Sequence, residues 1–519
     1  MSPTTEQPRA KRETERKYET APDRAVPNLS GLPGVAGEPV VDTFELSALY
    51  YDTDDHRLLD TGITLRRREG GDDAGWHLKL PIGGDSRTEL QLDTSAANES
   101  EVPPALTELL AAVIGSRSLG PLALITTDRE RHSLRDADGA TLMEVVSDLV
   151  VAAVTGSTDE GDHVWREIEV EQVSGGRDLA QAIEDRLLEA GMPRSTQPSK
   201  LRRAVGGSPR SMPADADPAS DPRAALALYL REHTRALLLA DIEQRRHTPE
   251  AAHDLRVAAR RLRSALQTHG AAIPDDELVS ATVDDLRWIG RRLGETRDVE
   301  VQQARFAEHL DSTADIPDRD ALRTLSDAYF GELAEAAEQV AIDTMTSSRY
   351  LAVFESLAAL TAACATTAAT TGRKAARKKA SSAVEHLVGK IDSRIRAADE
   401  ADDPQTHGEL LHRVRKGVKR LRYTVEVMQP AHSKRVNRAL SGYKDLQKLL
   451  GEHQDSVVAR SHVLAMLEEF GSVVPGRGTV AGFGLGLLYA REVSTDETES
   501  AKVRETWKKA RKATRDITK

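Results

Sequence analysis

The pattern of apolar residues changes completely after about residue 205, and this change limits what the chain can fold into. Before it, short segments alternate charged and apolar side chains between Gly, Asp and Pro. From residue 223 onward, Ala, Leu, Arg and Glu recur with helical spacing and no strand pattern is present. A period of two is typical of strands and a period of 3.6 is typical of helices. We predict an α+β multidomain protein with a strand-rich domain at 9–205, a Gly/Pro/Ser-rich linker at 206–222 and a helical domain at 223–519.

Charge and composition exclude several classes of protein. The 519 residues carry a formal net charge of −12 and only 4% aromatic residues, so broad nucleic-acid binding is not expected. Cys364 is the one cysteine, which excludes a disulfide framework. No apolar run reaches the roughly 18 residues that a membrane span requires, and the polar N-terminus does not resemble a signal peptide. We therefore expect a cytoplasmic protein with no membrane partner.

Charged residues alternate along several predicted strands of the first domain. Glu13, Glu15 and Lys17 would share one face of a strand, because side chains two residues apart point the same way. The same spacing recurs further along, at Arg66 with Arg68, Glu89 with Gln91, Arg129 with Arg131, and Glu167 with Glu169 and Glu171. A solvent-facing sheet would also give this pattern on any one strand. Its repetition favours a barrel with a charged lumen, interrupted by two helices, at 104–116 and 178–190.

The two kinds of charge predict a chemistry. Carboxylate oxygens are preferred ligands of Mg²⁺ and Mn²⁺, while Arg and Lys bind phosphate oxygens. A lumen that holds both suits a metal-bridged chain of phosphates. Phosphoryl transfer depends mainly on positioning and charge neutralisation, so such a lumen could support it with a water molecule as nucleophile.

The order of these motifs resembles the CYTH family, also called triphosphate tunnel metalloenzymes. The resemblance rests on the segments Glu13-x-Glu15-x-Lys17, Leu65–Arg68, Leu78–Pro81, Arg129-x-Arg131, Glu144 to Asp148, Glu167–Glu171 and Ser199-Lys200. It implies an eight-stranded antiparallel barrel whose tunnel binds triphosphate.

The resemblance also implies roles for particular residues. Those implied to hold metal or the attacking water, or to act beside them, are Glu13, Glu15, Lys17, Asp148, Glu169 and Glu171, with Glu13, Glu15, Glu169 and Glu171 as metal ligands. Those implied to bind phosphate are Arg66, Arg68, Lys79, Arg129, Arg131 and Lys200. The sequence leaves open which of Arg129 and Arg131, and which of Glu167, Glu169 and Glu171, face the substrate. Residues 70–75 enlarge the loop before Lys79.

The helical domain contains a duplicated basic motif. Its two copies are His253, Arg256, Arg260 and Arg263, and His412, Arg415, Lys419 and Arg422. A second matched pair ends at Asp298 and Asp455, although Gln454 stands where the first copy has Arg297. Matched motifs in the same order indicate a duplicated unit. Like charges at helical spacing destabilise an isolated helix, so these stripes require a negative partner, either an acidic helix of the domain or a polyanion. A merely solvated face is the simpler alternative.

Residues 223–519 resemble the CHAD family, a helical domain of two related halves found fused to CYTH domains. The resemblance implies that these basic helices bind inorganic polyphosphate. The leading hypothesis is a Mg²⁺- or Mn²⁺-dependent hydrolase of inorganic triphosphate or a nucleoside triphosphate, with polyphosphate bound by the helical domain. A polyphosphate-binding targeting protein that only senses triphosphate is one alternative. An adenylate cyclase is another, although no purine pocket can be identified in the sequence.

Overall fold

The computed structural model describes residues 8–93, 101–156, 163–206, 217–312, 316, 318–366, 373–471, 478–500 and 502–518. The chain divides into two compact units, residues 1–211 and 212–519, and each is described by itself. Residues 207–216, which make up most of the predicted linker, lie outside the described residues.

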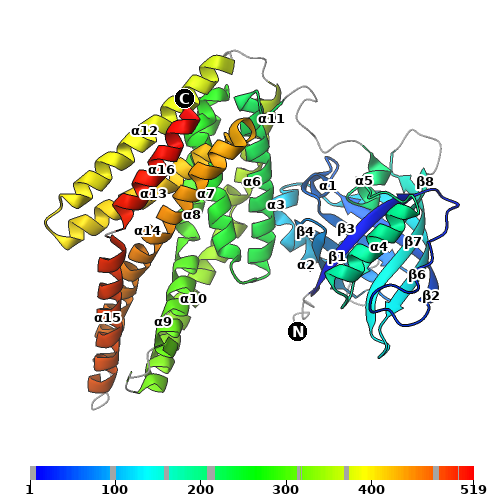
Figure 1. The fold of residues 1–519 in the computed structure, drawn as a ribbon, viewed down its shortest axis with the longest axis horizontal. Coiled ribbons are helices and arrows are strands. Elements are labelled where there is room, and N and C mark those ends of the chain that lie inside the picture. Colours follow the sequence, from blue (N-terminus) through cyan, green and yellow to red (C-terminus); the bar gives the residue numbers. More distant parts are fainter. Residues whose placement is uncertain are drawn as a thin grey trace. The chain divides into compact units, whose positions relative to one another are not determined.

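The first unit is built on a closed antiparallel barrel of eight strands (Figure 1). The strands are β1 Arg9–Thr20, β2 Val40–Asp52, β3 Thr64–Glu69, β4 Gly75–Gly83, β5 Ser86–Leu92, β6 Gly120–Arg135, β7 Thr141–Val154 and β8 His163–Gln172. Their order around the barrel is β1-β5-β4-β3-β2-β6-β7-β8. This confirms the barrel that the family resemblance implied.

Five short helices accompany the barrel. They are α1 Arg57–Thr61, α2 Pro104–Leu109, α3 Ala111–Ile114, α4 Arg177–Glu189 and α5 Lys200–Val205. The helix predicted at 178–190 is confirmed as α4. The single helix predicted at 104–116 is wrong, because the backbone leaves helical geometry at Leu110, between α2 and α3. Residues of both short helices are buried, so packing overrides the local helical preference.

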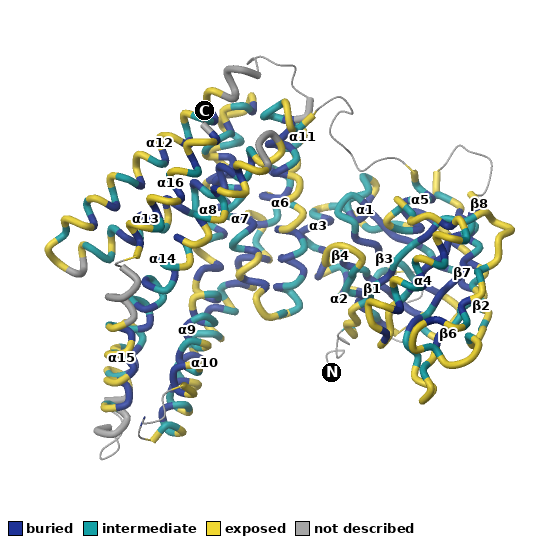
Figure 2. Tube along the Cα trace, viewed as in Figure 1, coloured by how far each residue is buried: buried dark blue, intermediate teal, exposed yellow. Residues whose placement is uncertain are grey.

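The outer face of the barrel packs apolar residues against α4. Leu179, Ile183 and Leu187 of α4 join one buried cluster with Tyr18 and Ile168 of the strands. Leu201 and Ala204 of α5 join a second cluster with residues of β2, β6, β7 and β8, some of which line the inside of the barrel. Apolar packing on the outer face and beside α5 leaves the rest of the inner face free to carry charge. Figure 2 shows the resulting mixture of buried and exposed residues along the strands.

The second unit is entirely helical in its described residues. Its long helices are α6 Pro222–Arg245, α7 Ala251–His269, α8 Asp276–Arg292, α9 Gly294–Ser312, α10 Arg319–Thr346, α11 Ser348–Thr366, α12 Arg373–Asp399, α13 Pro404–Glu426, α14 Gln429–Gly471, α15 Gly478–Ser500 and α16 Val503–Thr518. A short 3₁₀ turn, Gly270–Ala272, follows α7. Two Asp-Pro pairs begin helices: the side chains of Asp221 and Asp403 accept backbone N–H hydrogen bonds at the start of α6 and α13, where proline is tolerated.

Among the described residues of the helical unit, two apolar clusters lie around α14. One joins α12, α13, α14 and α16, and it includes Tyr443 and Trp507. The other joins α9, α10, α14 and α15, and it includes Phe306 and Phe330. Helix α14 contributes to both clusters, so it links the two parts of the unit. In the described part of the chain, no helix combines the length and the hydropathy that crossing a membrane would require.

Asp241 provides a test of the helical core. Its fully buried carboxylate accepts hydrogen bonds from Arg245 Nε at 2.9 Å and from the Tyr350 hydroxyl of α11 at 2.8 Å. Asp241→Ala should lower the free energy of unfolding by about 3–5 kcal/mol, because it removes one member of a buried ion pair and leaves the buried Tyr350 hydroxyl without its acceptor. Urea unfolding followed by helical circular dichroism would measure this loss. Asp327→Ala, at an exposed position on α10, is the control and should change stability by less than about 0.5 kcal/mol. Equal losses of unfolding free energy in the two variants would contradict a stabilising role for the buried carboxylate of Asp241.

Candidate functional site

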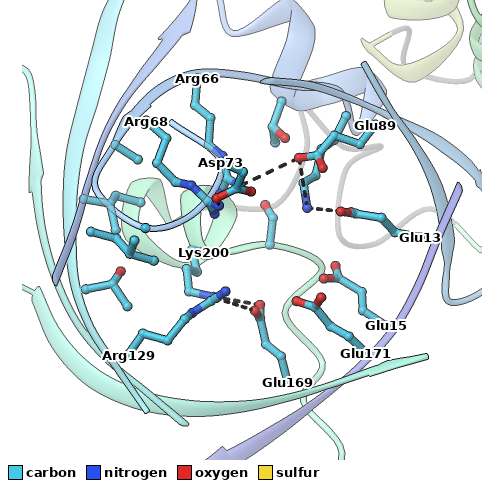
Figure 3. Close-up of a pocket in the computed structure, with 18 of the residues that line it drawn as sticks. Glu13, Glu15, Arg66, Arg68, Asp73, Glu89, Arg129, Glu169, Glu171 and Lys200 are labelled. Carbon is cyan, nitrogen blue, oxygen red and sulfur yellow. Dashed lines mark hydrogen bonds and ion pairs between the residues drawn. The ribbon is translucent and has the colours of Figure 1, made fainter. Parts of the chain in front are cut away.

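The barrel encloses a cavity of about 320 Å³ that is lined by charged side chains of both signs. All eight strands contribute to its lining, together with the start of α5. Figure 3 shows Glu13, Glu15 and Glu171 on one wall, with Arg66 and Arg68 across the lumen from them. The predicted charged lumen is therefore present, and the alternative of a solvent-facing sheet is wrong for these strands.

Three carboxylates gather on one wall. Glu15 pairs with Glu171 across β1 and β8, and Lys17 pairs with Glu169 in the same ladder. One oxygen of each of Glu15, Glu169 and Glu171 lies within 4.8 Å of the others. Burial raises the pKa of Glu171, and the nearby charge of Glu169 adds to this effect. Hard oxygen ligands at this spacing fit a divalent cation, whose charge would offset the cost of burying the carboxylates together.

Two lysines balance the neighbouring carboxylates. Lys17 forms an ion pair with Glu169 and lies 3.5 Å from Glu15. Lys200, at the start of α5, lies 2.7 Å from Glu169, 3.0 Å from Glu167 and 2.9 Å from Asp148. Burial would lower the pKa of Lys200, but Asp148 and the two glutamates hold it well above its usual value. Both ammonium groups therefore stay charged in the lumen.

The structure gives different surroundings to Arg129 and Arg131, whose roles the sequence left open. Arg129 Nε and Nη2 donate to Asp148 at 2.8 and 2.7 Å, and Nη2 also reaches Glu169 at 3.1 Å. Arg131 instead lies 3.1 Å from Asp72 and 3.3 Å from Asp42. Arg129 is thus linked to the carboxylate wall, and Arg131 lies farther along the lumen. Asp148 is completely buried and does not line the cavity, so it orients Arg129 and Lys200.

Arg66 and Arg68 form the opposite wall. Arg66 Nη1 donates to the Tyr50 hydroxyl at 3.2 Å, and Nη2 lies 3.8 Å from Glu89. Burial, together with the positive charges of Arg66 and Arg129, lowers the pKa of Arg68 to about 9. Clustered guanidinium groups at this density favour a multiply charged anion between them.

Glu13 lies apart from the three-carboxylate group. It accepts a hydrogen bond from Lys79 Nζ at 2.6 Å, and Lys79 also lies 3.5 Å from Glu89. Burial raises the pKa of Glu13 to about 7, although Lys79 opposes the shift. Glu89 lines the cavity and is buried, but it was not among the predicted site residues. Its alternation with Gln91 was the signal that could have identified it.

A second cluster of charges lies between the two copies of the basic helical motif. Helices α7 and α13 pack together, and Arg256, Arg260, Arg415 and Lys419 lie close enough for their charges to interact. Burial and these three arginines lower the pKa of Lys419 to about 6. Two acids partly compensate: Arg256 pairs with Asp298 at 3.1 Å and Arg415 with Asp455 at 3.9 Å. The same ion pair therefore recurs in both halves, at matched positions of the duplicated motifs.

The other members of the basic motifs have different surroundings. His412 Nδ1 contacts the side-chain oxygen of Gln454, so the residue that departs from the repeat is a partner of the motif. Arg422 donates to Glu426 at 3.0 Å and to Gln447 at 2.9 Å. Arg263 lies near Arg260, Arg287 and Arg420, and burial with these charges lowers its pKa. His253 lies near Arg297, and its pKa is lowered mainly by burial.

Comparison with known proteins matches both units to domain families. Residues 11–205 match the CYTH domain and residues 228–464 match the CHAD domain. The chain belongs to the proteins that join a CYTH domain to a CHAD domain. Two uncharacterized proteins of Mycobacterium tuberculosis, from two strains, are 33% identical to it over 509 residues, which cover 93% of this chain and 93% of each relative.

Solved structures resemble each domain separately. The CHAD domain from the plant Ricinus communis is 27% identical, with a TM-score of 0.43, and the match covers 58% of this chain and 97% of that one. HpAC1 from Hippeastrum, described as an adenylyl cyclase with a dominant triphosphatase activity, is 17% identical, with a TM-score of 0.24. That match covers 38% of this chain and 98% of the plant protein. The family assignment therefore rests on the domain matches and the mycobacterial relatives.

The carboxylate geometry generates a prediction about metal binding. Glu15→Gln with Glu171→Gln should weaken Mn²⁺ binding to the whole chain by at least about tenfold, because affinity follows the number of charged ligands. Titration with Mn²⁺, with the free ion followed by electron paramagnetic resonance, would measure it. Glu13→Gln is the matched control and should have a smaller effect, since Glu13 pairs with Lys79. A larger effect from Glu13→Gln would place the ion beside Glu13 and Glu89 rather than at the three clustered glutamates.

Proposed function

We propose that the CYTH domain hydrolyses the terminal phosphate of inorganic triphosphate or of a related triphosphorylated compound. The observation that carries this proposal is the division of one lumen, inside the closed barrel, into a carboxylate wall and a guanidinium wall. A metal site alone would not need Arg66 and Arg129, and an anion site alone would not need three clustered glutamates. Together they suit a phosphate chain neutralised from both sides. The CYTH family includes triphosphatases and cyclases, in agreement with this reading.

Glu15, Glu169 and Glu171 would hold the divalent cation, Mg²⁺ or Mn²⁺, which when bound supplies positive charge to the phosphate oxygens and to the reacting water. Among the protein's own groups, Arg66, Arg129 and Lys200 would fix the phosphate oxygens. Lys17 and Lys79 would do so as well, each already oriented by a glutamate. Because all of these groups are held by neighbours before substrate arrives, little reorganisation is needed when it binds.

The proposed reaction is a hydrolysis at the end of the chain. The oxygen of a water molecule attacks the terminal phosphorus, and the bond from that phosphorus to the bridging oxygen breaks. The electron pair leaves with the bridging oxygen, the water proton passes to the surroundings, and the products are orthophosphate and pyrophosphate. The arginine wall would stabilise the charge that spreads over the terminal phosphate oxygens and the leaving oxygen.

A phosphate-release assay on the full chain tests this function. Tripolyphosphate with Mg²⁺ or Mn²⁺ should release orthophosphate, and chelation of the metal should abolish the release. Arg66→Ala should lower kcat/KM by at least about tenfold, because a charge-assisted contact contributes about 1.5–3 kcal/mol. An unchanged kcat/KM together with a collapsed melting temperature would mean that Arg66 is structural. Release of cyclic AMP from ATP without release of orthophosphate from either substrate would favour a cyclase instead.

We also propose that the CHAD domain binds inorganic polyphosphate between α7 and α13. Asp298 and Asp455 compensate only part of the charge of Arg256, Arg260, Arg415 and Lys419. Within the described residues, neither Arg260 nor Lys419 forms an ion pair with a carboxylate. Burial lowers the pKa of Lys419, and so does this excess of positive charge. A flexible polyanion would relieve it, which supports the polyanion reading over a solvated face.

Charge reversal on the full chain tests polyphosphate binding. Replacing Arg256, Arg260, Arg415 and Lys419 by Glu should abolish binding of long-chain polyphosphate, because the cluster would become anionic. Lys448, Lys508, Lys512 and Arg515 are exposed outside the cluster, so their replacement by Glu changes net charge equally and is the control. Fluorescence anisotropy with labelled polyphosphate would compare the two variants. Equal loss in both would indicate general electrostatic attraction, and no binding by the original chain at low salt would contradict the proposal.

A further inference from the structure

The loop between β3 and β4 brings two aspartates into the tunnel. Asp73 forms an ion pair with Arg68, and Asp72 accepts a hydrogen bond from Arg131 Nη1 at 3.1 Å. Both aspartates line the cavity with the arginines that they contact. Figure 3 shows Asp73 beside Arg68, inside the ring of strands. Two guanidinium groups suited to phosphate are therefore already held by carboxylates of the chain itself.

This loop is held in place by its backbone. Gly70 has a φ of 81°, and a Cβ there would lie 2.3 Å from the carbonyl oxygen of Glu45. Gly75 has a φ of 147°, and a Cβ there would lie 2.5 Å from the carbonyl oxygen of Leu92. The ring of the buried His77 contacts the backbone oxygen of Asp73 through Nε2 at 2.8 Å and Glu89 through Nδ1 at 2.9 Å. A carbonyl oxygen can only accept, so Nε2 carries the proton. The two glycines and His77 thus fix the position of the aspartates.

The barrel register places the two held arginines toward one mouth of the tunnel. Strands β3 and β6 both run antiparallel to β2, so they run parallel to each other. Arg68 lies two residues beyond Arg66, and Arg131 two residues beyond Arg129, in this shared direction. Two residues of strand correspond to about 7 Å. Along its own strand, Arg68 therefore lies nearer this mouth than Arg66, and Arg131 lies nearer than Arg129. We call Arg66 and Arg129 the inner tier and Arg68 and Arg131 the outer tier.

The opposite end of the lumen is bounded by Lys200. Lys200 begins α5, whose Leu201 and Ala204 join one cluster with Ala123 of β6 and Ala152 of β7, residues near that end of their strands. Its ammonium group contacts Asp148, Glu167 and Glu169. A phosphate chain seated against Lys17, Lys200 and Arg129 would extend toward the mouth that carries Arg68 and Arg131. A phosphate chain that extends beyond the inner tier would therefore reach Asp72 and Asp73, at the place where its next phosphates need positively charged side chains.

We propose that Asp72 and Asp73 set the length of phosphate chain that the tunnel accepts, favouring triphosphate over long-chain polyphosphate. The carboxylates occupy Arg131 and Arg68 and repel phosphates beyond the inner tier. This inference rests on the proposed hydrolase function and adds a substrate preference to it. It also keeps the two domains distinct in ligand: long chains bind the CHAD helices, and short chains enter the barrel.

The test compares two substrates on the full chain. For Asp72→Asn with Asp73→Asn, the ratio of kcat/KM for long-chain polyphosphate to kcat/KM for tripolyphosphate should rise by at least about tenfold, because Asn keeps the shape and removes the repelling charge. Substrate is kept in large excess over protein, so that capture by the CHAD domain does not change its free concentration. Asp23→Asn with Asp138→Asn, two exposed positions outside the cavity lining, is the matched control and should leave the ratio unchanged.

The outcomes separate this inference from the proposed function. If the original chain hydrolyses tripolyphosphate but the ratio does not rise in the Asn variant, the length-selecting role is overturned and the hydrolase function stands. If the original chain hydrolyses neither substrate, the hydrolase function is overturned and the inference falls with it. Loss of tripolyphosphate hydrolysis in a folded Asn variant would place the aspartates in the catalytic machinery and would also overturn the inference. Asp72→Asn alone, at a largely exposed side chain, provides a variant that keeps the fold and should give part of the increase.

Discussion

The barrel depends on one constraint: charges buried in its lumen must be paired with each other. Lys200 lies within 3.0 Å of three carboxylates, and Arg129 binds a completely buried aspartate through two nitrogens. An isolated charge in such a place would be strongly unfavourable, whereas paired and hydrogen-bonded charges are tolerated. Apolar packing offsets this cost: the outer face of the barrel packs against α4, and a second apolar cluster joins α1 and α5 to residues that include part of the inner face. The highly charged part of the lumen is therefore flanked by hydrophobic packing.

The helical domain, in contrast, holds a cluster of cations that are not fully paired with carboxylates. Between α7 and α13, cations of the two repeated motifs face each other with only partial compensation from Asp298 and Asp455. In the barrel Lys17, Lys79 and Lys200 are each paired with glutamates before any ligand arrives. Between the helices, the unmatched charge is what an external polyanion would neutralise. The lumen thus holds largely paired charges, whereas the cluster between α7 and α13 keeps an excess of positive charge.

Much of the fold and part of the site could be predicted because they follow from the spacing of side chains along single strands and helices. Alternation at Glu13, Glu15 and Lys17 indicated a charged strand face, and the closed barrel confirms a charged lumen. The break at Leu110 could not be predicted, since it reflects burial of residues on both sides of it. Asp72 and Asp73 were also missed as site residues, because their loop has no period that relates it to Arg68 and Arg131.

The sequence by itself determined the two classes of domain, the kinds of charge in each and the duplication of the basic motif. Side-chain type and period are local properties, so they can be read along one strand or helix. Only the tertiary structure decided which charges meet: that Arg129 binds Asp148, that Glu13 lies with Lys79 apart from Glu15 and Glu171, and that the two basic motifs face each other. These partners are far apart in sequence, and closure of the barrel and packing of α7 against α13 bring them within the few ångströms over which charges interact strongly.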